Sequence, residues 1–304
     1  MSLRVIDFFC GAGGSTTGAT WAGATVVAAV NHWRVAATSY ERNHGFRPLS
    51  DTLSDVRPED LPTCDVMLFS PECQSHSAAR GARPRDEISR NTAWEVVRFA
   101  RACLPRVLVV ENVPALRGWP SFPHWAADLR DLGYSLNEDH AGRVGQILDS
   151  ADFGAPTARR RLFVVGVRQE AQVQIVPPRT EHRAAAECID WSLPMRSASN
   201  VAPSTQERIR QAHETFGESP CLLVYYGVGP QVAGLNRPCR TITTRDRFAL
   251  YHRGRLRMLQ PRELLRMQGF PPTYWLAGTR AEQVMQIGNS CVPAVVAEIV
   301  RQAA

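Results

Sequence analysis

The sequence predicts an α/β fold with a doubly wound, mostly parallel sheet and a second, small irregular lobe. In the first part of the chain, short apolar segments rich in β-branched residues alternate with helix-like stretches. This alternation is typical of a parallel sheet covered by helices on both faces. Beyond residue 176 the alternation stops, and prolines, glycines and short strand-like runs replace it. Such a stretch favours loops and short strands over a continued sheet.

Taken in order, the apolar segments and the stretches between them define the predicted elements. The segments expected to form strands are Arg4–Cys10, Thr25–Val30, Asp65–Ser70, Arg106–Glu111 and Arg161–Val167. The stretches expected to form helices are Ser15–Ala22, Trp33–Asn43, Thr92–Cys103, Gln206–Phe216 and Cys291–Gln302. We therefore expect three parts: a main domain over 1–175, a small lobe over 176–257, and C-terminal helices over 258–304 that return to the main domain.

Composition places the chain among globular proteins. Its 304 residues suit two lobes, and 44% hydrophobic with 21% charged residues exclude a wholly disordered or fibrous protein. No apolar run approaches the roughly 18 residues of a membrane span, so no membrane partner is expected. The N-terminal apolar stretch is shorter than a signal peptide and precedes glycines. We therefore expect a cytoplasmic protein.

The eight cysteines are scattered and contain no CxxC pair, and the histidines are scattered too. This spacing predicts neither a metal site nor a disulfide framework.

The basic residues are unevenly distributed. All 35 are arginines, which a GC-rich genome would explain. However, residues 1–154 hold 15 arginines against 18 acidic residues, whereas residues 155–304 hold 20 against 11. The second half is strongly basic, which indicates a polyanionic partner. A solvated basic face without a partner is the alternative.

A glycine-rich turn follows the first predicted strand. The segment DFFCGAGG, Asp7–Gly14, lets the backbone approach a ligand at the carboxyl end of that strand. Ser15, Thr16 and Thr17 can cap the following helix. The turn could serve a dinucleotide, S-adenosylmethionine or no ligand at all, because it contains neither GxGxxG nor a Walker motif.

Two later polar residues extend the turn's ligand hypothesis. Asn31 ends the second strand, where ribose hydroxyls often bind, and Asp55 could accept a hydrogen bond from an adenine amino group. Either could instead be an ordinary strand-end or turn residue.

Three further strand ends carry reactive side chains. Cys73 follows the third strand and could act as a nucleophile, although a lone cysteine is usually structural. Glu111 ends an apolar strand and is a candidate acid, with a cap as the alternative. Alternation places Arg159 and Arg161 on one face and Arg160 on the other. Such a pair suits a carbonyl oxygen or phosphate, unless it is merely an exposed basic turn.

Taken in order, these motifs resemble those of the DNA cytosine-5 methyltransferase family over most of the chain outside roughly 176–225. DFFCGAGG is similar to the family's cofactor motif, SPECQSHS to its Pro-Cys motif, and ENV to its glutamate motif. APTARRRLFVVG is similar to its Gln-x-Arg-x-Arg motif. RPCRTIT and GNSCVP are similar to its last two motifs. Six motifs in the family's order make this resemblance specific.

The resemblance implies transfer of a methyl group from S-adenosylmethionine to C5 of a cytosine flipped out of a specific DNA sequence. It implies that Cys73 adds covalently to C6, that Glu111 contacts N3, and that Arg161, supported by Arg159, contacts O2. The main domain would then be catalytic and cofactor-binding, and the lobe over 176–257 would recognise the target. Double-stranded DNA is the implied partner of a monomeric enzyme, with a restriction endonuclease beside it in a restriction-modification system.

The resemblance also assigns the remaining binding residues. Those assigned to the cofactor are Phe9, Gly11, Gly13, Gly14, Asn31, Asp55, Val56, Thr92, Asn289 and Ser290. Those assigned to DNA or the flipped base are Gln74, Ser77, Asn112, Arg237 and Thr241.

Three positions depart from the family pattern. Glu72 replaces a proline beside the nucleophile, where a carboxylate disfavours a thiolate. Asn31 replaces a ribose-binding glutamate, and Thr157 replaces the glutamine of the arginine motif. Two other functions stay open: an RNA cytosine methyltransferase of the same fold, and a catalytically weak DNA-binding protein. The RNA-acting branch carries a Cys-Phe-Thr element that this sequence lacks, and intact Cys73, Glu111 and Arg161 argue against the second.

Overall fold

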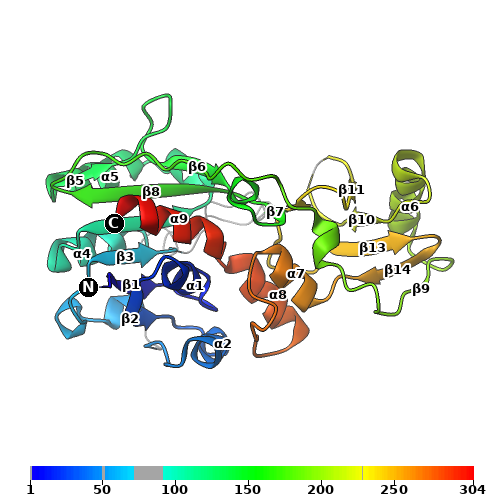
Figure 1. Ribbon diagram of the computed structural model, residues 1–304, viewed down its shortest axis with the longest axis horizontal. Coiled ribbons are helices and arrows are strands. Elements are labelled where there is room, and N and C mark those ends of the chain that lie inside the picture. Colours follow the sequence, from blue (N-terminus) through cyan, green and yellow to red (C-terminus); the bar gives the residue numbers. More distant parts are fainter. Residues whose placement is uncertain (1, 50–51, 72–91, 228) are drawn as a thin grey trace.

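The computed structural model describes residues 2–49, 52–71, 92–227 and 229–304. The chain forms a larger lobe around a seven-stranded sheet and a smaller lobe around a five-stranded sheet (Figure 1). Within the described residues, no helix is long and apolar enough to cross a membrane.

The larger sheet has a parallel part and an antiparallel part. β1 (Arg4–Phe8) pairs in parallel with β2 (Thr25–Val30) and with β3 (Val66–Phe69), and β3 pairs in parallel with β4 (Val107–Asn112). β8 (Arg160–Arg168) runs antiparallel to β4. The prediction of a doubly wound, mostly parallel sheet is therefore confirmed, with strand order β2-β1-β3-β4-β8-β5.

Residues 122–149 contain three elements that the sequence analysis did not predict. α5 (Phe122–Asp131) packs on the sheet, and β5 (Tyr134–Leu136) and β6 (Gln146–Asp149) both pair antiparallel with β8. The two strands span three and four residues, too few for a two-residue periodicity to stand out.

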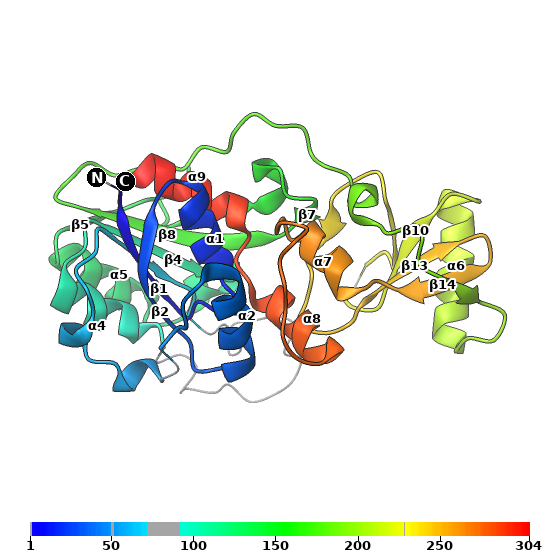
Figure 2. The ribbon, with the colours of Figure 1, turned by 60° about the horizontal axis from the view of Figure 1, so that its bottom comes forward.

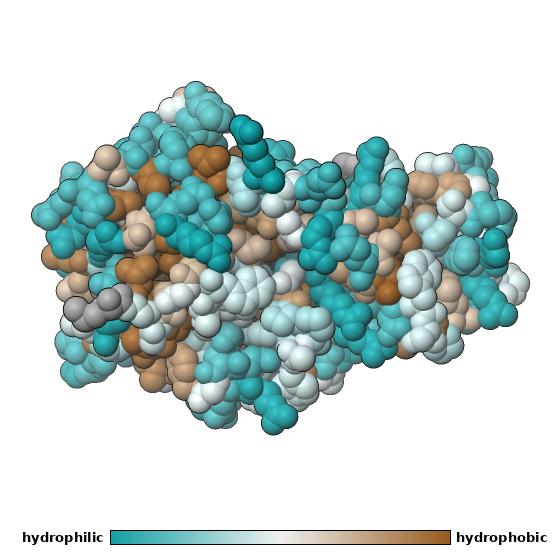
Figure 3. All heavy atoms as spheres, viewed as in Figure 1, coloured by the Kyte–Doolittle hydropathy of each residue, from teal (hydrophilic) through white to brown (hydrophobic). Residues whose placement is uncertain are grey.

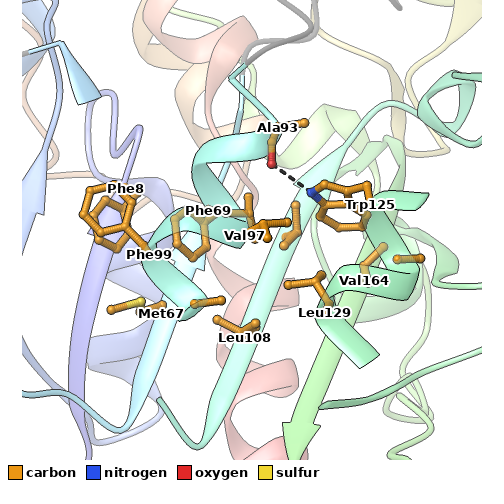
Figure 4. Packing of buried hydrophobic residues seen from close by; sticks show 14 of the residues in the cluster. Phe8, Met67, Phe69, Ala93, Val97, Phe99, Leu108, Trp125, Leu129 and Val164 are labelled. Carbon is orange, nitrogen blue, oxygen red and sulfur yellow. Dashed lines mark hydrogen bonds between the residues drawn. The ribbon is translucent and has the colours of Figure 1, made fainter. Parts of the chain in front are cut away.

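Helices cover both faces of the larger sheet. α4 (Trp94–Cys103) and α5 pack on one face, where Trp125 is buried and its indole N–H donates to the Ala93 carbonyl at 2.8 Å (Figure 4). α1 (Gly14–Trp21) and the C-terminal α9 (Pro293–Ala303) pack on the other face. Figure 2 shows α9 alongside α1, so the C-terminal helix lies against the larger lobe. α2 (Arg34–His44) follows β2.

The smaller lobe is an antiparallel sheet flanked by one long helix. Its strand order is β11-β10-β13-β14-β9, and α6 (Pro203–Phe216) packs on β10. α7 (Pro261–Met267) and α8 (Arg280–Asn289) lie between the lobes in Figure 1. The strands are β9 (Arg196–Ser197), β10 (Cys221–Val224), β11 (Val232–Gly234), β13 (Phe248–His252) and β14 (Arg255–Met258).

A two-stranded ribbon joins the lobes. β7 (Thr157–Ala158) pairs in parallel with β12 (Cys239–Arg240). Because β8 begins two residues after β7, this ribbon ties the smaller lobe to the strand that carries the arginines. Short 3-10 turns complete the fold at Leu53–Asp55, Pro58–Asp60, Pro114–Gly118, Ser150–Phe153 and Ala185–Cys188.

Candidate active site

Glu111, Arg159 and Arg161 lie together at the edge of the larger sheet that faces the smaller lobe. β1, β3 and β4 are parallel, so their carboxyl ends share this edge, and β8 begins there because it runs the opposite way (Figure 1). The register pairs Asn112 with Leu162. Arg161 therefore lies one residue beyond the last pair of β4 and β8, beside the end of β4.

Glu111 and Arg161 form a close pair at this edge. Arg161 Nε lies 3.1 Å from Glu111 Oε1, and the two side chains are only 16% and 11% exposed. That oxygen is nevertheless buried and accepts no hydrogen bond within the described part of the chain, because the arginine N–H is not aligned with it. A narrow pocket there is lined by Glu111, Ser150, Arg159, Arg161, Phe163, Val292 and Val295. The site therefore offers an oriented carboxylate with unused acceptor capacity.

The alternation predicted for the three arginines is confirmed. Arg159 and Arg161 both line the pocket, whereas Arg160 is exposed. Arg159 is 4% exposed, and its guanidinium donates to the carbonyls of Ile242 at 3.2 Å and Gly288 at 3.0 Å. Sequence reasoning alone did not indicate these two backbone partners.

Asn112 holds the segment that leads to the predicted nucleophile. Its Nδ2 donates to the Pro71 carbonyl at 3.1 Å, and its Oδ1 accepts from the Val113 amide at 2.8 Å. The side chain is 2% exposed. These bonds tie Asn112 to the backbone of Pro71 and Val113, and the expected contact of Asn112 with substrate stays a prediction. Cys73, with Glu72, Gln74 and Ser77, lies outside the described residues.

Ser70 and Cys291 were not singled out by sequence analysis, yet they meet beside this segment. Their Oγ and Sγ atoms lie 3.1 Å apart. Burial and, to a lesser degree, the nearby Glu111 carboxylate together raise the pKa of the Cys291 thiol to about 12. This thiol is therefore neutral near pH 7 and unsuited to nucleophilic attack.

The other described cysteines are equally unsuited to act as nucleophiles. In each case burial is the main cause of a pKa raised above the ordinary value; the residues are Cys10, Cys64, Cys103, Cys188, Cys221 and Cys239. Within the described ranges, no three His, Cys, Asp or Glu residues gather as a metal site would require.

The glycine turn leaves space at one position and is tightly packed at two others. A Cβ on Gly11 would meet only the Phe9 carbonyl oxygen, at 3.9 Å, so this glycine faces open space. One on Gly13 would lie 2.3 Å from His44 Nε2, and one on Gly14 would lie 2.4 Å from the Cys291 carbonyl oxygen. A side chain at Gly14 would thus clash with backbone, one at Gly13 would clash with His44 and Tyr274, and Gly11 faces open space.

The turn also contains a strained residue. Phe9 has φ 58°, in the left-handed region that a bulky side chain rarely adopts. Such strain is typical of functional sites.

The expected helix cap after the turn is wrong. α1 begins at Gly14, with Gly13 at its N-cap and no side-chain cap bond. Thr16 lies inside the helix, where its hydroxyl donates to Asp7 Oδ2 at 2.7 Å and lies 2.9 Å from the Tyr40 hydroxyl. Gly13, with a positive φ, is the N-cap, and the helix begins at Gly14. Ser15, Thr16 and Thr17 therefore lie inside the helix and not at its N-cap.

Asn31 lies next to the glycine turn, because the Cys10 amide donates to the Val30 carbonyl at 3.1 Å. Asn31 is 8% exposed, and its Nδ2 donates to the Trp33 carbonyl at 3.1 Å. A glutamate could not make that bond. The amide oxygen Oδ1 is an acceptor that this bond does not use.

The remaining predicted cofactor residues are dispersed around the same edge. Asp55 is exposed, and Val56 is buried in the core beside Phe8. Thr92 lies two residues before α4. Asn289 ends α8 with an exposed side chain, whereas the Ser290 hydroxyl donates to the Gln286 carbonyl at 2.7 Å.

The two predicted DNA-contacting residues in the described part of the second half lie in and after the joining ribbon. Arg237 is exposed just before β12. Thr241 donates to the Ala158 carbonyl at 3.0 Å, and its own carbonyl accepts from the Tyr226 hydroxyl at 2.7 Å. Thr157 donates to the Cys239 carbonyl at 3.2 Å. Thr157 and Thr241 therefore hold the two lobes together. The exposed side chain of Arg237 is available to a binding partner.

Comparison with known proteins agrees with this arrangement. The family model described as C-5 cytosine-specific DNA methylase matches residues 3–215 and 194–304. The type II methyltransferase M.HgiDI of Herpetosiphon aurantiacus is 28% identical over 295 residues, which cover 95% of this chain and 90% of that protein. M.MthTI of Methanothermobacter thermautotrophicus is also 28% identical, but the match covers 59% of this chain and about half of that protein, 53%.

Among solved structures, a prophage-encoded DNA modification methyltransferase of E. coli has the same fold. It is 21% identical, covers 99% of this chain and 98% of its own, and superposes with a TM-score of 0.72. At 21% sequence identity, this similarity shows that the two chains share a fold.

Proposed function

The chain belongs to the C-5 cytosine-specific DNA methylase family, and on that basis we propose that it methylates C5 of a cytosine flipped out of a specific DNA sequence. The observation that carries this proposal is the Glu111–Arg161 pair, buried at the sheet edge beside the segment that leads to Cys73. A carboxyl group and a guanidinium placed side by side can bind the neighbouring N3 and O2 atoms of cytosine, the carboxyl group at N3 and the guanidinium at O2.

The chemistry requires a nucleophile, because C5 of cytosine does not attack a methyl sulfonium unaided. In the proposed mechanism the Cys73 thiolate adds to C6 and makes C5 enamine-like, Glu111 assists at N3, and Arg161 stabilises charge at O2. C5 then attacks the methyl group supplied by S-adenosylmethionine, which would leave as S-adenosylhomocysteine, and loss of the C5 proton with release of Cys73 gives 5-methylcytosine. Because every described cysteine has a raised pKa, the described part of the chain offers no competing thiolate.

S-adenosylmethionine, which supplies the methyl group, fits the residues at the glycine turn. Gly11 leaves open space, Asn31 has an amide oxygen that can accept from a ribose hydroxyl, and Asp55 presents an exposed carboxylate for an amino group. Asn289 and Ser290 lie nearby, because Cys291 packs against Gly14. Gly14 would act indirectly by allowing this packing, and Gly13 by leaving room for His44 and Tyr274.

Double-stranded DNA is the proposed substrate of the smaller lobe, for which we retain the range 176–257. Its arginines fall into two groups. Arg183 pairs with Glu187 at 2.8 Å, and Arg210 pairs with Glu207 and Glu214. By contrast, Arg196 and Arg237 are exposed and make no side-chain hydrogen bond or ion pair with any residue that the structure describes. The second group is therefore suited to phosphates and base edges.

Transfer of labelled methyl from S-adenosylmethionine tests the proposal. DNA should be labelled and RNA should not; the reverse would favour the RNA methyltransferase, and no transfer with retained DNA binding would favour the inactive binding protein. Bisulfite sequencing of a methylation-free host expressing the chain would give the target sequence. A restriction-modification role would further require an endonuclease that cuts this sequence only when it is unmethylated.

Trapping with 5-fluorocytosine DNA tests the nucleophile. The native chain should form a stable covalent complex, because the fluorine cannot leave, whereas Cys73→Ser should bind the same DNA without forming one. Near-native methylation by Cys73→Ser would refute the assignment.

A further inference from the structure

Arg159 lies where three distant segments of the chain meet. It stands between β7 and β8, and its guanidinium reaches the Ile242 carbonyl in the segment after β12 and the Gly288 carbonyl in the last turn of α8. The side chain is 4% exposed. One planar fork thus bridges two backbone oxygens from separate elements, a geometry that a lysine ammonium reproduces poorly.

The backbone around Arg159 is held in place as well. Ser150 Oγ donates to the Thr157 carbonyl at 2.6 Å and accepts from the Arg159 amide at 3.0 Å. Thr241 Oγ1 donates to the Ala158 carbonyl at 3.0 Å. Bonds on both sides therefore fix where the guanidinium can reach.

Gly288 shows how closely the two bridged segments approach. A Cβ at this position would lie 2.5 Å from the carbonyl carbon and oxygen of Thr243 and from the Thr244 amide nitrogen. Because all three are backbone atoms, they cannot move aside as a flexible side chain could. Any added side chain would therefore separate α8 from the 241–244 segment.

We propose that Arg159 is a positioning residue that couples the cofactor-binding end of α8 to the Glu111–Arg161 pair. On one side of the bridge, Asn289 and Ser290 directly follow Gly288. On the other side, Arg161 is two residues from Arg159, and both line the pocket that contains Glu111. The inference rests on the proposed function, because that function assigns the cofactor to Asn289 and Ser290 and the cytosine to the Glu111–Arg161 pair.

Arg159→Lys tests the inference, with Arg160→Lys as the matched control on the exposed neighbour. Calorimetry without DNA should show S-adenosylmethionine binding about ten- to a hundredfold weaker in Arg159→Lys, the range expected when a charged buried hydrogen bond is lost. kcat should fall too, while KM for DNA stays within about twofold. Arg160→Lys should bind the cofactor like the native chain.

Gly288→Ala provides an independent second variant, because it separates the same segments without changing a charge. It should show the same pattern of weaker cofactor binding and lower kcat. Millimolar guanidinium should partly restore cofactor binding to Arg159→Ala but not to Gly288→Ala. A merely structural role would not produce this difference. Each measurement is made well below the variant's melting temperature, on protein whose circular dichroism matches that of the native chain.

Two results would overturn the inference while leaving the proposed function intact. One is native cofactor affinity and kcat in a folded Arg159→Lys. The other is a rise confined to KM for DNA, which would make Arg159 a DNA contact instead. A native chain that binds S-adenosylmethionine but transfers no methyl group would refute the proposed function, and weaker binding by Arg159→Lys would still support the link to α8. A native chain that binds no S-adenosylmethionine would refute both.

Discussion

At the scale of single residues, Glu111 combines burial with an oxygen that no described donor uses. Its neighbour Arg161 lies at ion-pair distance but out of hydrogen-bonding alignment. A buried polar atom in this state costs free energy unless a ligand completes it. We propose that the substrate supplies the missing hydrogen-bond partner of this oxygen, in keeping with the proposed contact between Glu111 and N3 of cytosine.

Glu111→Gln tests this role while keeping the side chain's shape. We expect the single-turnover rate of methyl transfer to fall about 10²- to 10⁴-fold, because the amide cannot transfer the proton. Glu170→Gln is the control, since that carboxylate lies on the surface beside Arg106. A loss below tenfold would give Glu111 a structural role.

Asp7 is a second buried carboxyl, beneath the glycine turn. Its exposed fraction is zero, and burial raises its pKa from 3.8 to about 7, opposed by the hydrogen bond from Thr16. Between these two pKa values the folded chain holds a proton that the unfolded chain releases. The free energy of unfolding therefore falls as pH rises from about 4 to about 7.

Asp7→Asn should remove this part of the pH dependence, because an amide does not titrate in this range. The free energy of unfolding, measured by urea denaturation at several pH values, should decline less between pH 4 and 7 in the variant than in the native chain. Equal declines in both proteins would show that Asp7 does not cause the effect.

At the scale of elements, the start of α1 depends on contact with the segment that enters α9. Both helices cover the same face of the larger sheet, and Gly14 meets the Cys291 carbonyl without room for a Cβ. The glycine motif and the closing motif therefore form one packed unit, although they lie at opposite ends of the chain.

Gly14→Ala should destabilise the fold by about 1–3 kcal/mol, the usual range for overpacking a tight contact. Gly118→Ala is the control, since a Cβ there would meet nothing within 4 Å. Urea denaturation measures both changes. A native-like midpoint for Gly14→Ala would show that the two segments separate at little cost.

At the scale of the whole molecule, two lobes of different charge face each other across the candidate site. Residues 155–304 hold 20 arginines against 11 acidic residues, whereas residues 1–154 hold 15 against 18. On the face seen in Figure 3, hydrophilic residues cover much of the smaller lobe. Such a lobe suits the phosphates of a duplex.

Binding to DNA should therefore weaken steeply with salt, through release of counterions from the phosphates. Arg196→Gln and Arg237→Gln should each reduce the slope of log binding constant against log salt by about 1 if they contact phosphates. Arg210→Gln is the control, because Glu207 and Glu214 already pair with that guanidinium. A binding constant that does not change with salt would contradict a phosphate-binding lobe.

The smaller lobe should also determine the methylated sequence. Grafting residues 176–236 from this chain onto a related methyltransferase of different specificity should transfer the target sequence, as read by bisulfite sequencing. An unchanged target would place recognition elsewhere in the chain.

The sequence by itself determined which elements form the parallel part of the sheet and which residues stand at their ends. The apolar run Val107–Val110, within the predicted strand Arg106–Glu111, indicates a buried strand. Because the ends of parallel strands share an edge, Glu111 and the glycine turn could be placed together in advance. Alternation along the arginine strand was equally predictable, because it is a local property of extended backbone.

Only the tertiary structure decided how distant segments meet. β8 runs antiparallel to β4 and thereby brings Arg161 to Glu111, and Arg159 turns to carbonyls of two other elements. Gly13 and Gly14 serve packing as much as any ligand. Local sequence patterns report the periodicity and capping of a single element. Strand direction and the backbone oxygen that a buried guanidinium reaches depend instead on contacts between segments far apart in the chain, which no local pattern records.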